Sequence, residues 1–222
     1  MNVYLYQNNT EKILKNIYIG EYGWKPWENT ILYMPLDTVN GRTDIQWHST
    51  VDVNNNITYW TFGWVDCASF PAASNYINVN DVAFPNQWTM LIWVNNINQK
   101  QSSIWRASGA NAWLSYSSTQ WYYVWENNTY FGKTATNHWY LIAYCNSSTA
   151  ADKKQYIVDN WTITSISCNN NDNALNTTKN VILSDSNAYF NWYMSALIIE
   201  DRIWTSQEMI DYYNQTKSNY WL

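Results

Sequence analysis

The chain has 222 residues, of which 18% are aromatic, with 16 tryptophans but only six glycines and a formal net charge of −5. This length allows one all-β sandwich or at most two small domains, and it can bury a large core without disulfides. Charged residues make up only 13% of the chain, and the basic ones form no cluster that could neutralise phosphates, so nucleic acid is excluded as an expected partner.

The first 27 residues are predicted to form a β-arm or hairpin that is separate from the rest. Residues 3–6 and 17–20 are two similar aliphatic and aromatic fragments on either side of a polar segment. The start carries neither the basic region nor the apolar run of a signal peptide, and no run approaches the roughly 20 apolar residues of a membrane span. Pro26 lacks an amide donor and restricts its neighbour, so it marks a boundary. Residues 28–222 are therefore predicted to form a single domain.

Short, alternating, aromatic-rich runs separated by Asn, Ser, Thr and Gly fill the chain from about residue 85, which is typical of antiparallel strands. A further strand is expected at 30–37, where the main domain begins. Thr205-Ser206-Gln207-Glu208 is a candidate capping box, so a helix of two to three turns should follow it. The other predicted strands are 88–94, 102–108, 112–117, 121–126, 139–145, 154–158, 161–167, 180–183 and 193–201.

A series of short motifs runs in a fixed order from residue 31 to residue 209. The motifs are ILYMPLD at 31–37, DIQW at 44–47, WTMLIWV at 88–94, NHWYLIAY at 137–144, QYIVDNW at 155–161, YFNWYM at 189–194 and RIWTSQEM at 202–209. In this order they resemble the strands and closing helix of laminin-G-like domains, which are concanavalin-A-like lectin and glucanase jelly rolls. The resemblance implies an all-β fold, an antiparallel two-sheet jelly-roll sandwich with a short C-terminal helix.

Six tryptophans stand where glycine is expected, either in the family pattern or in similar contexts. These suspected native glycine positions are Trp47, Trp60, Trp64, Trp161, Trp192 and Trp221. In an Asn-Gly hairpin turn both central residues take positive φ, which costs a residue with a Cβ about 1–2 kcal/mol. We hypothesise that an alternative genetic code reads UGA as glycine at these positions, and the coding DNA tests this.

Catalysis is not expected. Glucanases of this superfamily place two or more carboxylates on one strand face, as in Glu-x-Asp-x-Glu, to act on a glycosidic bond, and that alternation does not occur in the sequence. Glu200 and Asp201 are adjacent, so in a strand they point to opposite faces, and we interpret them as a surface pair. His48 and His138 show no nucleophile signature or metal-type spacing.

Calcium is the metal that the resemblance implies, held by carboxylates and carbonyls near two turns. Asp44 is retained in the first turn, but residues 195–196 of the second are Ser and Ala, which removes acidic ligands. No other cofactor is expected. The three cysteines are too few for a disulfide framework or a zinc site. Cys67, Cys145 and Cys168 are therefore interpreted as buried thiols, and a bridge between Cys145 and Cys168 is the alternative.

Aromatic and amide side chains gather between residues 116 and 128. Aromatic rings that stack on sugar faces, with amides that bond the hydroxyls, are the usual basis of glycan binding. The same alternation along a strand is also typical of a core, which is the alternative. The predicted carbohydrate-binding residues are Tyr116, Trp121, Tyr123, Trp125, Asn127 and Asn128.

The sequence therefore predicts a non-catalytic recognition or adhesion module, with a glycan or other cell-surface ligand as its partner. The arm resembles N-terminal pieces of phage tail and other virion proteins, so a virion or the extracellular surface is the expected location, with no membrane insertion. One rival is a purely structural protein that self-associates in a virion or surface array. A second rival is a glycoside hydrolase with displaced carboxylates.

Overall fold

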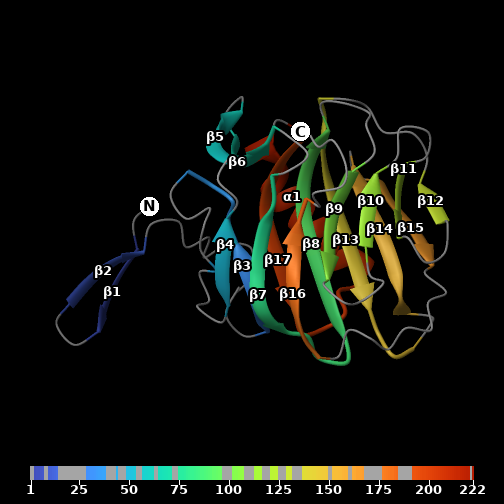
Figure 1. Cartoon of the computed structure of the whole chain (residues 1–222), viewed down its shortest axis with the longest axis horizontal. Coiled ribbons are helices and arrows are strands. Elements are labelled where there is room, and N and C mark those ends of the chain that lie inside the picture. The colour runs from blue at the N-terminus through green and yellow to red at the C-terminus, as the bar shows by residue number, and fades with distance from the viewer. Residues whose placement is uncertain are drawn as a thin grey trace.

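The computed structural model describes most of the chain as two facing antiparallel sheets (Figure 1). The described residues are 3–7, 10–14, 29–38, 44, 49–53, 57–62, 65–71, 75–96, 102–107, 113–116, 121–124, 129–131, 137–149, 152–159, 162–167, 177–184, 192–220 and 222. The predicted fold class, an all-β antiparallel two-sheet sandwich with a short C-terminal helix, is confirmed.

The larger sheet has eight strands in the order β15-β14-β13-β8-β17-β6-β5, and β3 also pairs with β17. One side of β17 pairs with β8, whereas the other side pairs first with β6 and then with β3. β5 and β15 therefore lie at its two ends. The bounds are β3 Thr30–Met34, β5 Thr58–Phe62, β6 Val65–Phe70, β8 Trp88–Asn96, β13 Trp139–Asn146, β14 Lys154–Asp159, β15 Thr162–Ser167 and β17 Trp192–Glu200.

The smaller sheet has seven strands in the order β12-β11-β10-β9-β16-β7-β4. β12 contacts β15 of the larger sheet, so the two sheets meet at that end of the sandwich. The bounds are β4 Thr50–Val53, β7 Ile77–Ala83, β9 Ser102–Ala107, β10 Trp113–Tyr116, β11 Trp121–Val124, β12 Thr129–Phe131 and β16 Thr178–Leu183.

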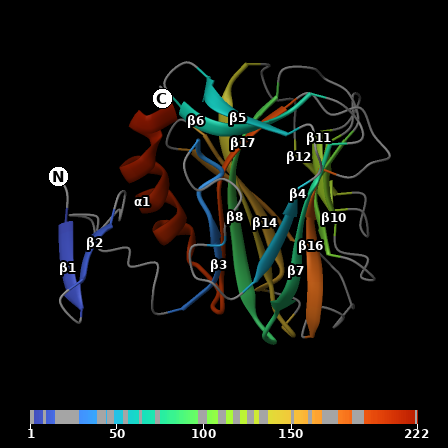
Figure 2. The same cartoon turned by 60° about the vertical axis from the view of Figure 1, so that its left-hand side comes forward.

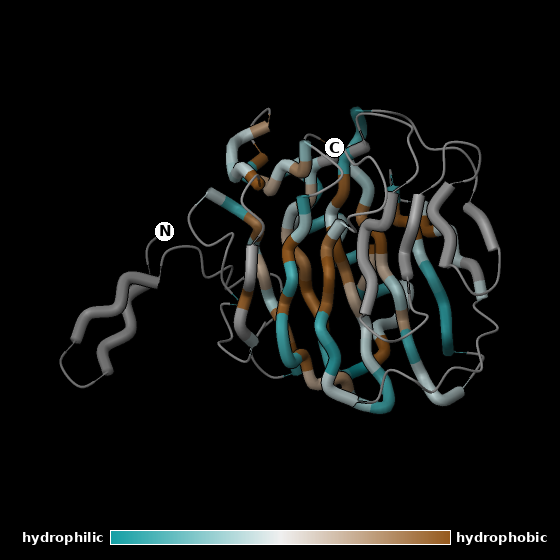
Figure 3. Tube along the Cα trace, viewed as in Figure 1, coloured by the Kyte–Doolittle hydropathy of each residue, from teal (hydrophilic) through white to brown (hydrophobic). Residues whose placement is uncertain are grey.

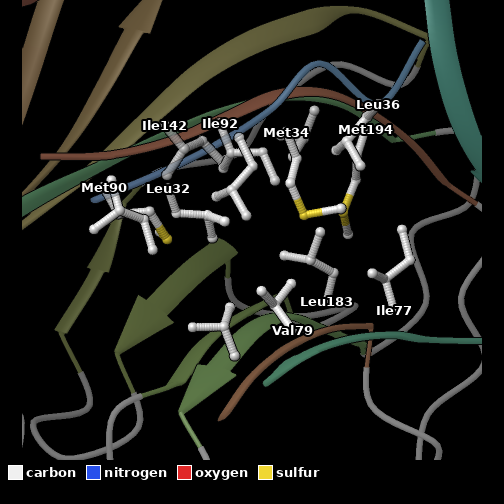
Figure 4. Packing of buried hydrophobic residues seen from close by; sticks show 14 of the residues in the cluster. Leu32, Met34, Leu36, Ile77, Val79, Met90, Ile92, Ile142, Leu183 and Met194 are labelled. Carbon is white, nitrogen blue, oxygen red and sulfur yellow. The ribbon is translucent and has the colours of Figure 1, made fainter. Parts of the chain in front are cut away.

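The core lies between the sheets because alternate residues of each strand point inward. Met90 and Ile92 of β8 face Val79 of β7 and Leu183 of β16, and all four are fully buried (Figure 4). The central strands carry the hydrophobic stretches in Figure 3. Burial of apolar surface on this scale is the main force that holds the two sheets together.

A second apolar layer covers the outer face of the larger sheet, where the helix α1 (Ser206–Thr216) and the short 3-10 helix η3 (Lys217–Tyr220) lie (Figure 2). Trp93 of β8 is fully buried there. The centroid of its ring lies 4.0 Å from that of Tyr220 and 5.4 Å from that of Tyr213. The helix begins at the predicted capping box, with Thr205 as the N-cap. Among the described residues, no helix is long and apolar enough to cross a membrane.

A separate two-stranded sheet is formed near the N-terminus by β1 (Val3–Gln7) and β2 (Thr10–Leu14). The predicted partner of the first strand was the fragment 17–20, but β1 pairs with residues 10–14 instead. Gln7 pairs with Thr10, so only two residues separate the strands, and both are asparagines. Asparagine tolerates the φ values of two-residue hairpin loops, which favours the nearer partner. Residues 15–28 lie outside the described part of the chain.

Candidate functional site

Among the described residues, Trp60 is the large hydrophobic residue that is exposed to solvent, with 45% of its surface accessible. It lies in the middle of β5, the strand at one end of the larger sheet. Tyr59 packs on the core between the sheets, whereas Phe62 packs on the layer that α1 covers. Because side chains alternate along a strand, Trp60 shares the face of Phe62. The indole therefore extends the outer aromatic layer beyond the helix and into solvent.

Three aromatic rings hold one another on this face, and we name Trp60, Phe62 and Tyr193 the aromatic shelf. Phe62 stacks on Tyr193 of β17, with ring centroids 4.3 Å apart and an interplanar angle of 28°. The ring of Trp60 lies 5.6 Å from Tyr193 and 6.4 Å from Phe62. Such pairs contribute about 0.5–1.5 kcal/mol beyond their buried area. The two inner rings thus position the exposed indole before any ligand arrives.

Cys67 of β6 contacts Trp60 across the β5–β6 hairpin and helps to fix its backbone. Trp60 pairs with Cys67, whose buried thiol donates to the Trp60 carbonyl at 3.6 Å. Burial raises the pKa of Cys67 to about 12, so this thiol is neutral. Burial, and then the nearby Cys67, also raise the pKa of Tyr193 above its ordinary value. The shelf therefore rests on uncharged groups.

Asp66 of β6 pairs with Thr61 of β5, so its side chain points to the face of the sheet opposite the shelf. Its side chain is exposed, and its Oδ1 accepts a 2.6 Å hydrogen bond from the Thr61 hydroxyl. The other oxygen accepts from Thr38 at 3.4 Å. The Asp66 carbonyl accepts from Ser195, which in turn accepts from the hydroxyl of Tyr220. These bonds connect the hairpin to the segment that contains Thr38 and to the 3-10 helix η3.

The predicted carbohydrate-binding residues lie elsewhere in the sandwich. Tyr116 ends β10, and Trp121 and Tyr123 lie in the neighbouring strand β11, where Tyr123 pairs with Ser115. The structure thus places these three on adjacent strands and describes only their backbone. Trp125, Asn127 and Asn128 lie outside the described residues. β11 and β5 stand at opposite ends of the sandwich, so this set and the shelf are separate candidates (Figure 1).

Asp44, the predicted calcium ligand, is 1% exposed and bridges two segments of backbone. Its Oδ1 accepts from the Tyr33 amide at 3.2 Å, and its Oδ2 accepts from the Ser49 amide at 3.1 Å. Among the residues that the structure describes, no three His, Cys, Asp or Glu side chains gather as a metal site. Calcium therefore stays a prediction, and Asp44 has a structural role of its own.

The interpretation of Glu200 and Asp201 as a surface pair is wrong for Glu200, which is 2% exposed. Glu200 Oε2 accepts from Arg202 Nε at 3.0 Å and from Trp204 Nε1 at 2.6 Å. The chain turns back after β17, so these donors satisfy the buried carboxylate. Asp201 is exposed, as expected. Glu200 anchors the segment that leads into α1.

His138 connects two neighbouring strands of the larger sheet. His138 Nε2 lies 2.7 Å from Asp159 Oδ1, and its ring packs edge-on against Tyr140. His138 precedes β13 and Asp159 ends β14, so the pair connects neighbouring strands. His48 lies outside the described residues.

The cysteines agree with the thiol interpretation where they are described. Cys67 and Cys145 are free and buried, so the alternative bridge between Cys145 and Cys168 is not formed. Burial raises the pKa of Cys145 to about 11. Cys168 itself lies in a segment that the structure does not describe.

Two suspected glycine positions lie in strands, since Trp60 is in β5 and Trp192 begins β17. Asp159 pairs with Thr162, so Asn160 and Trp161 are the two residues that join β14 to β15. Two-residue hairpin loops are those in which Asn-Gly is preferred. The glycine hypothesis stays a prediction. The positions outside the described residues are Trp47, Trp64, Trp161 and Trp221.

Comparison with known proteins identifies the fold. No family model and no curated protein sequence matches the chain. Among solved structures, the receptor-binding domain of botulinum neurotoxin D has a TM-score of 0.62 at 12% identity and covers 84% of this chain and 52% of its own.

Two further neighbours show the same extent of similarity. The botulinum neurotoxin type G receptor-binding domain has a TM-score of 0.59 at 15% identity and covers 84% of this chain and 51% of its own. The serotype D ligand-binding domain in complex with N-acetylneuraminic acid has a TM-score of 0.59 at 13% identity, with 84% and 50% covered. The chain thus shares their β-sandwich fold and spans about half of their length.

Proposed function

We propose that this chain is a non-catalytic recognition module that binds glycans, and that the aromatic shelf is its contact surface. The observation that carries the proposal is the exposed indole of Trp60, which Phe62 and Tyr193 hold in place. The proposal therefore takes residue 60 as tryptophan in the native protein, against the glycine hypothesis at this one position, and glycine at residue 60 in the native peptide masses would reject it. An aromatic face fixed before binding loses little conformational entropy when a ligand stacks on it. Sugar rings present apolar C–H faces, which suit such a surface.

The fold supports the proposal. Similar sandwiches occur in receptor-binding domains, one of which was solved in complex with N-acetylneuraminic acid. This chain spans only about half of those domains, so the complex with N-acetylneuraminic acid gives a reason to test this chain for sugar binding. The laminin-G-like kinship and the setting on a phage virion or bacterial surface, outside the cell, belong to the same proposal.

Glycan-array binding of the purified chain tests the function, with variants that separate the two candidate surfaces. Trp60→Ala removes the exposed ring of the shelf, and Trp121→Ala removes one ring of the predicted set on β11. Binding that Trp60→Ala abolishes and Trp121→Ala leaves intact supports the shelf. The reverse pattern assigns binding to the predicted set, and no binding on any glycan rejects the proposal.

A structural role is the second candidate, and the edge strand β15 favours it. Its six residues, TITSIS, include no charge and no proline, the devices that usually protect an edge from pairing with another chain. Self-assembly through this edge would suit a virion or surface array. Light scattering of the wild type and a Thr164→Lys variant tests it, since Thr164 is exposed and a lysine on the edge should disrupt such pairing.

A hydrolase with displaced carboxylates is the remaining alternative. Incubation with a polysaccharide panel, followed by measurement of reducing sugars, tests it directly. Our proposal predicts no sugar release even from a polysaccharide that the chain binds.

A further inference from the structure

We infer that the 3-10 helix η3 (Lys217–Tyr220) is a lid over a second sugar subsite, in which the ring of Tyr220 occupies the place of a sugar. This inference rests on the proposed function and extends the binding surface beyond the aromatic shelf. The subsite consists of Trp93, Trp139 and Asn95 on the outer face of the larger sheet. Neither tryptophan is a suspected glycine position, so the subsite does not depend on how UGA is read.

The subsite continues the shelf across the strands of the sheet. Asn95 of β8 pairs with Trp139 of β13 on one side and with Tyr193 of β17 on the other. Directly paired residues lie on one face, so the three form a row, and Tyr193 is a ring of the shelf. Neighbouring strands are about 4.8 Å apart, which places Trp139 about 10 Å from Tyr193. An oligosaccharide along this row would contact the shelf and the subsite together.

Tyr220 fills the subsite with a flat ring and a hydroxyl group. Its ring stacks on Trp93, with centroids 4.0 Å apart and an interplanar angle of 17°, and its centroid lies 5.1 Å from that of Trp139. The Tyr220 hydroxyl donates to Ser195 Oγ at 3.2 Å. Stacking on an indole, with hydrogen bonds at the edge of the ring, is also how an aromatic site holds a sugar. Tyr220 and a sugar would therefore compete for one place.

Two polar groups of the subsite are left unsatisfied by Tyr220. The Nε1 of Trp93 and the Oδ1 of Asn95 are buried, and neither has a hydrogen-bond partner within the part of the chain that the structure describes. The two residues share a face of β8, with Cα atoms about 7 Å apart. One group donates and the other accepts, and a sugar hydroxyl does both. Because a buried polar group without a partner costs free energy, a sugar that bonds these groups gains an advantage over Tyr220.

The helix η3 can move without unfolding α1. Tyr220 alone is buried among the four residues of η3, whereas Ser218 and Asn219 are exposed. The helix α1 buries three side chains of its own. One of them, Tyr213, also stacks on Trp93 with centroids 5.4 Å apart, so Trp93 stays supported when η3 leaves. A short segment that buries one side chain opens at a lower free energy than the core.

Removal of the Tyr220 ring should strengthen binding. In the wild type the ligand must displace this ring, so the apparent affinity is reduced by the fraction of molecules in which the lid is open. The loss of one aromatic pair corresponds to a factor of roughly 2 to 12 in that equilibrium. We therefore expect Tyr220→Ala to bind an oligosaccharide that spans both surfaces more tightly than the wild type by this factor.

Isothermal titration calorimetry tests this, with the oligosaccharide that gives the strongest signal on a glycan array as the probe. Tyr220→Ala should bind it roughly 2- to 12-fold more tightly than the wild type. Adding Asn95→Leu, which replaces the amide by an apolar side chain of similar size, should remove this gain. Ser218→Ala, at an exposed position of the same helix, is the matched control and should bind like the wild type.

Hydrogen exchange of the wild-type chain tests the lid without any substitution. The Leu222 amide donates to the Lys217 carbonyl at 3.3 Å, and the Lys217 amide donates to the Tyr213 carbonyl. Saturation with the oligosaccharide should displace η3 and break these bonds. The peptide that covers residues 217–222 should then exchange faster, while the amides of β8 and β17 do not.

The contrary outcomes separate the inference from the function. Binding by Tyr220→Ala that is equal to or weaker than that of the wild type would overturn the inference and leave glycan binding intact. If Tyr220→Ala fails to fold, the exchange experiment decides, and unchanged or slower exchange of residues 217–222 would overturn the lid. The absence of binding to any printed glycan, by the wild type and by Tyr220→Ala, would reject the proposed function and the inference with it.

Discussion

Replacement of Asp44 is expected to destabilise the sandwich without any contribution from calcium. The buried carboxylate accepts from the amides of Tyr33 and Ser49, and so it connects β3 to the segment that enters β4. In Asp44→Ala both amides lose this acceptor, and Tyr33 is buried where water does not replace it. The variant therefore tests whether Asp44 acts through these two bonds.

The size of the effect follows from the cost of leaving each buried donor unsatisfied, about 1–3 kcal/mol. Ser49 is only half-buried, so its amide should contribute near the lower end of this range. The sum is about 3 kcal/mol, which corresponds to a decrease in Tm of about 6–12 °C for a chain of this size. Asp44→Asn keeps one acceptor oxygen, so it should lose about half as much.

Urea unfolding and calorimetry of the wild type and both variants, each with EDTA and with calcium, measure these changes. Asp201→Asn is the control, since its exposed side chain should change stability by less than about 0.5 kcal/mol. We expect the same loss with and without calcium. An Asp44→Ala variant as stable as the wild type in EDTA would refute the two-amide argument, and a loss seen only with calcium would assign Asp44 to a metal.

Four further results are expected. The thiols of Cys67 and Cys145 should react with a thiol reagent at pH 8 only after denaturation, because their pKa values are raised to about 12 and 11. Since unfolding restores the ordinary value of 9.0, stability should fall as the pH rises above about 9 and continue to fall up to about 11–12, which pH-dependent urea titration measures. Thr205→Ala removes the N-cap of α1 and should cost about 1 kcal/mol, while Thr205→Ser should cost less, as urea midpoints can show. The coding DNA should carry UGA at Trp161 and Trp192, with glycine in the peptide masses of the native protein, and UGG codons there would reject the glycine hypothesis.

Much of the fold could be predicted because apolar alternation and capping are local signals. The strands β8, β13 and β14 carry continuous aromatic and aliphatic residues, and they appear within one or two residues of their expected bounds. The helix start at Thr205 follows from four adjacent residues. The order of the motifs then predicted two facing sheets, which the structure has.

Strands rich in polar residues were not predicted between residues 50 and 83. β7 includes asparagines whose side chains bond each other, since Asn78 Nδ2 donates to Asn80 Oδ1 at 2.6 Å. Such residues are typical of loops in a sequence. Only the pairing of β7 with β4 and β16 shows that they lie in a sheet.

The aromatic shelf could not be found from the sequence because its rings come from distant strands. Trp60 and Phe62 lie in β5, whereas Tyr193 lies in β17. The context of Trp60 indicated a glycine position, so its side chain was not considered as a contact surface. Burial of Glu200 was missed for a similar reason, because its donors become neighbours only where the chain turns back.

The central claim is that this chain binds glycans through Trp60. Isothermal titration calorimetry with the oligosaccharide that gives the strongest array signal tests it most directly, on the wild type and on Trp60→Ala. We expect saturable binding by the wild type and affinity at least about tenfold weaker in the variant, the effect of losing a central aromatic contact. Equal affinity in the two proteins, or no heat of binding in either, would contradict the claim.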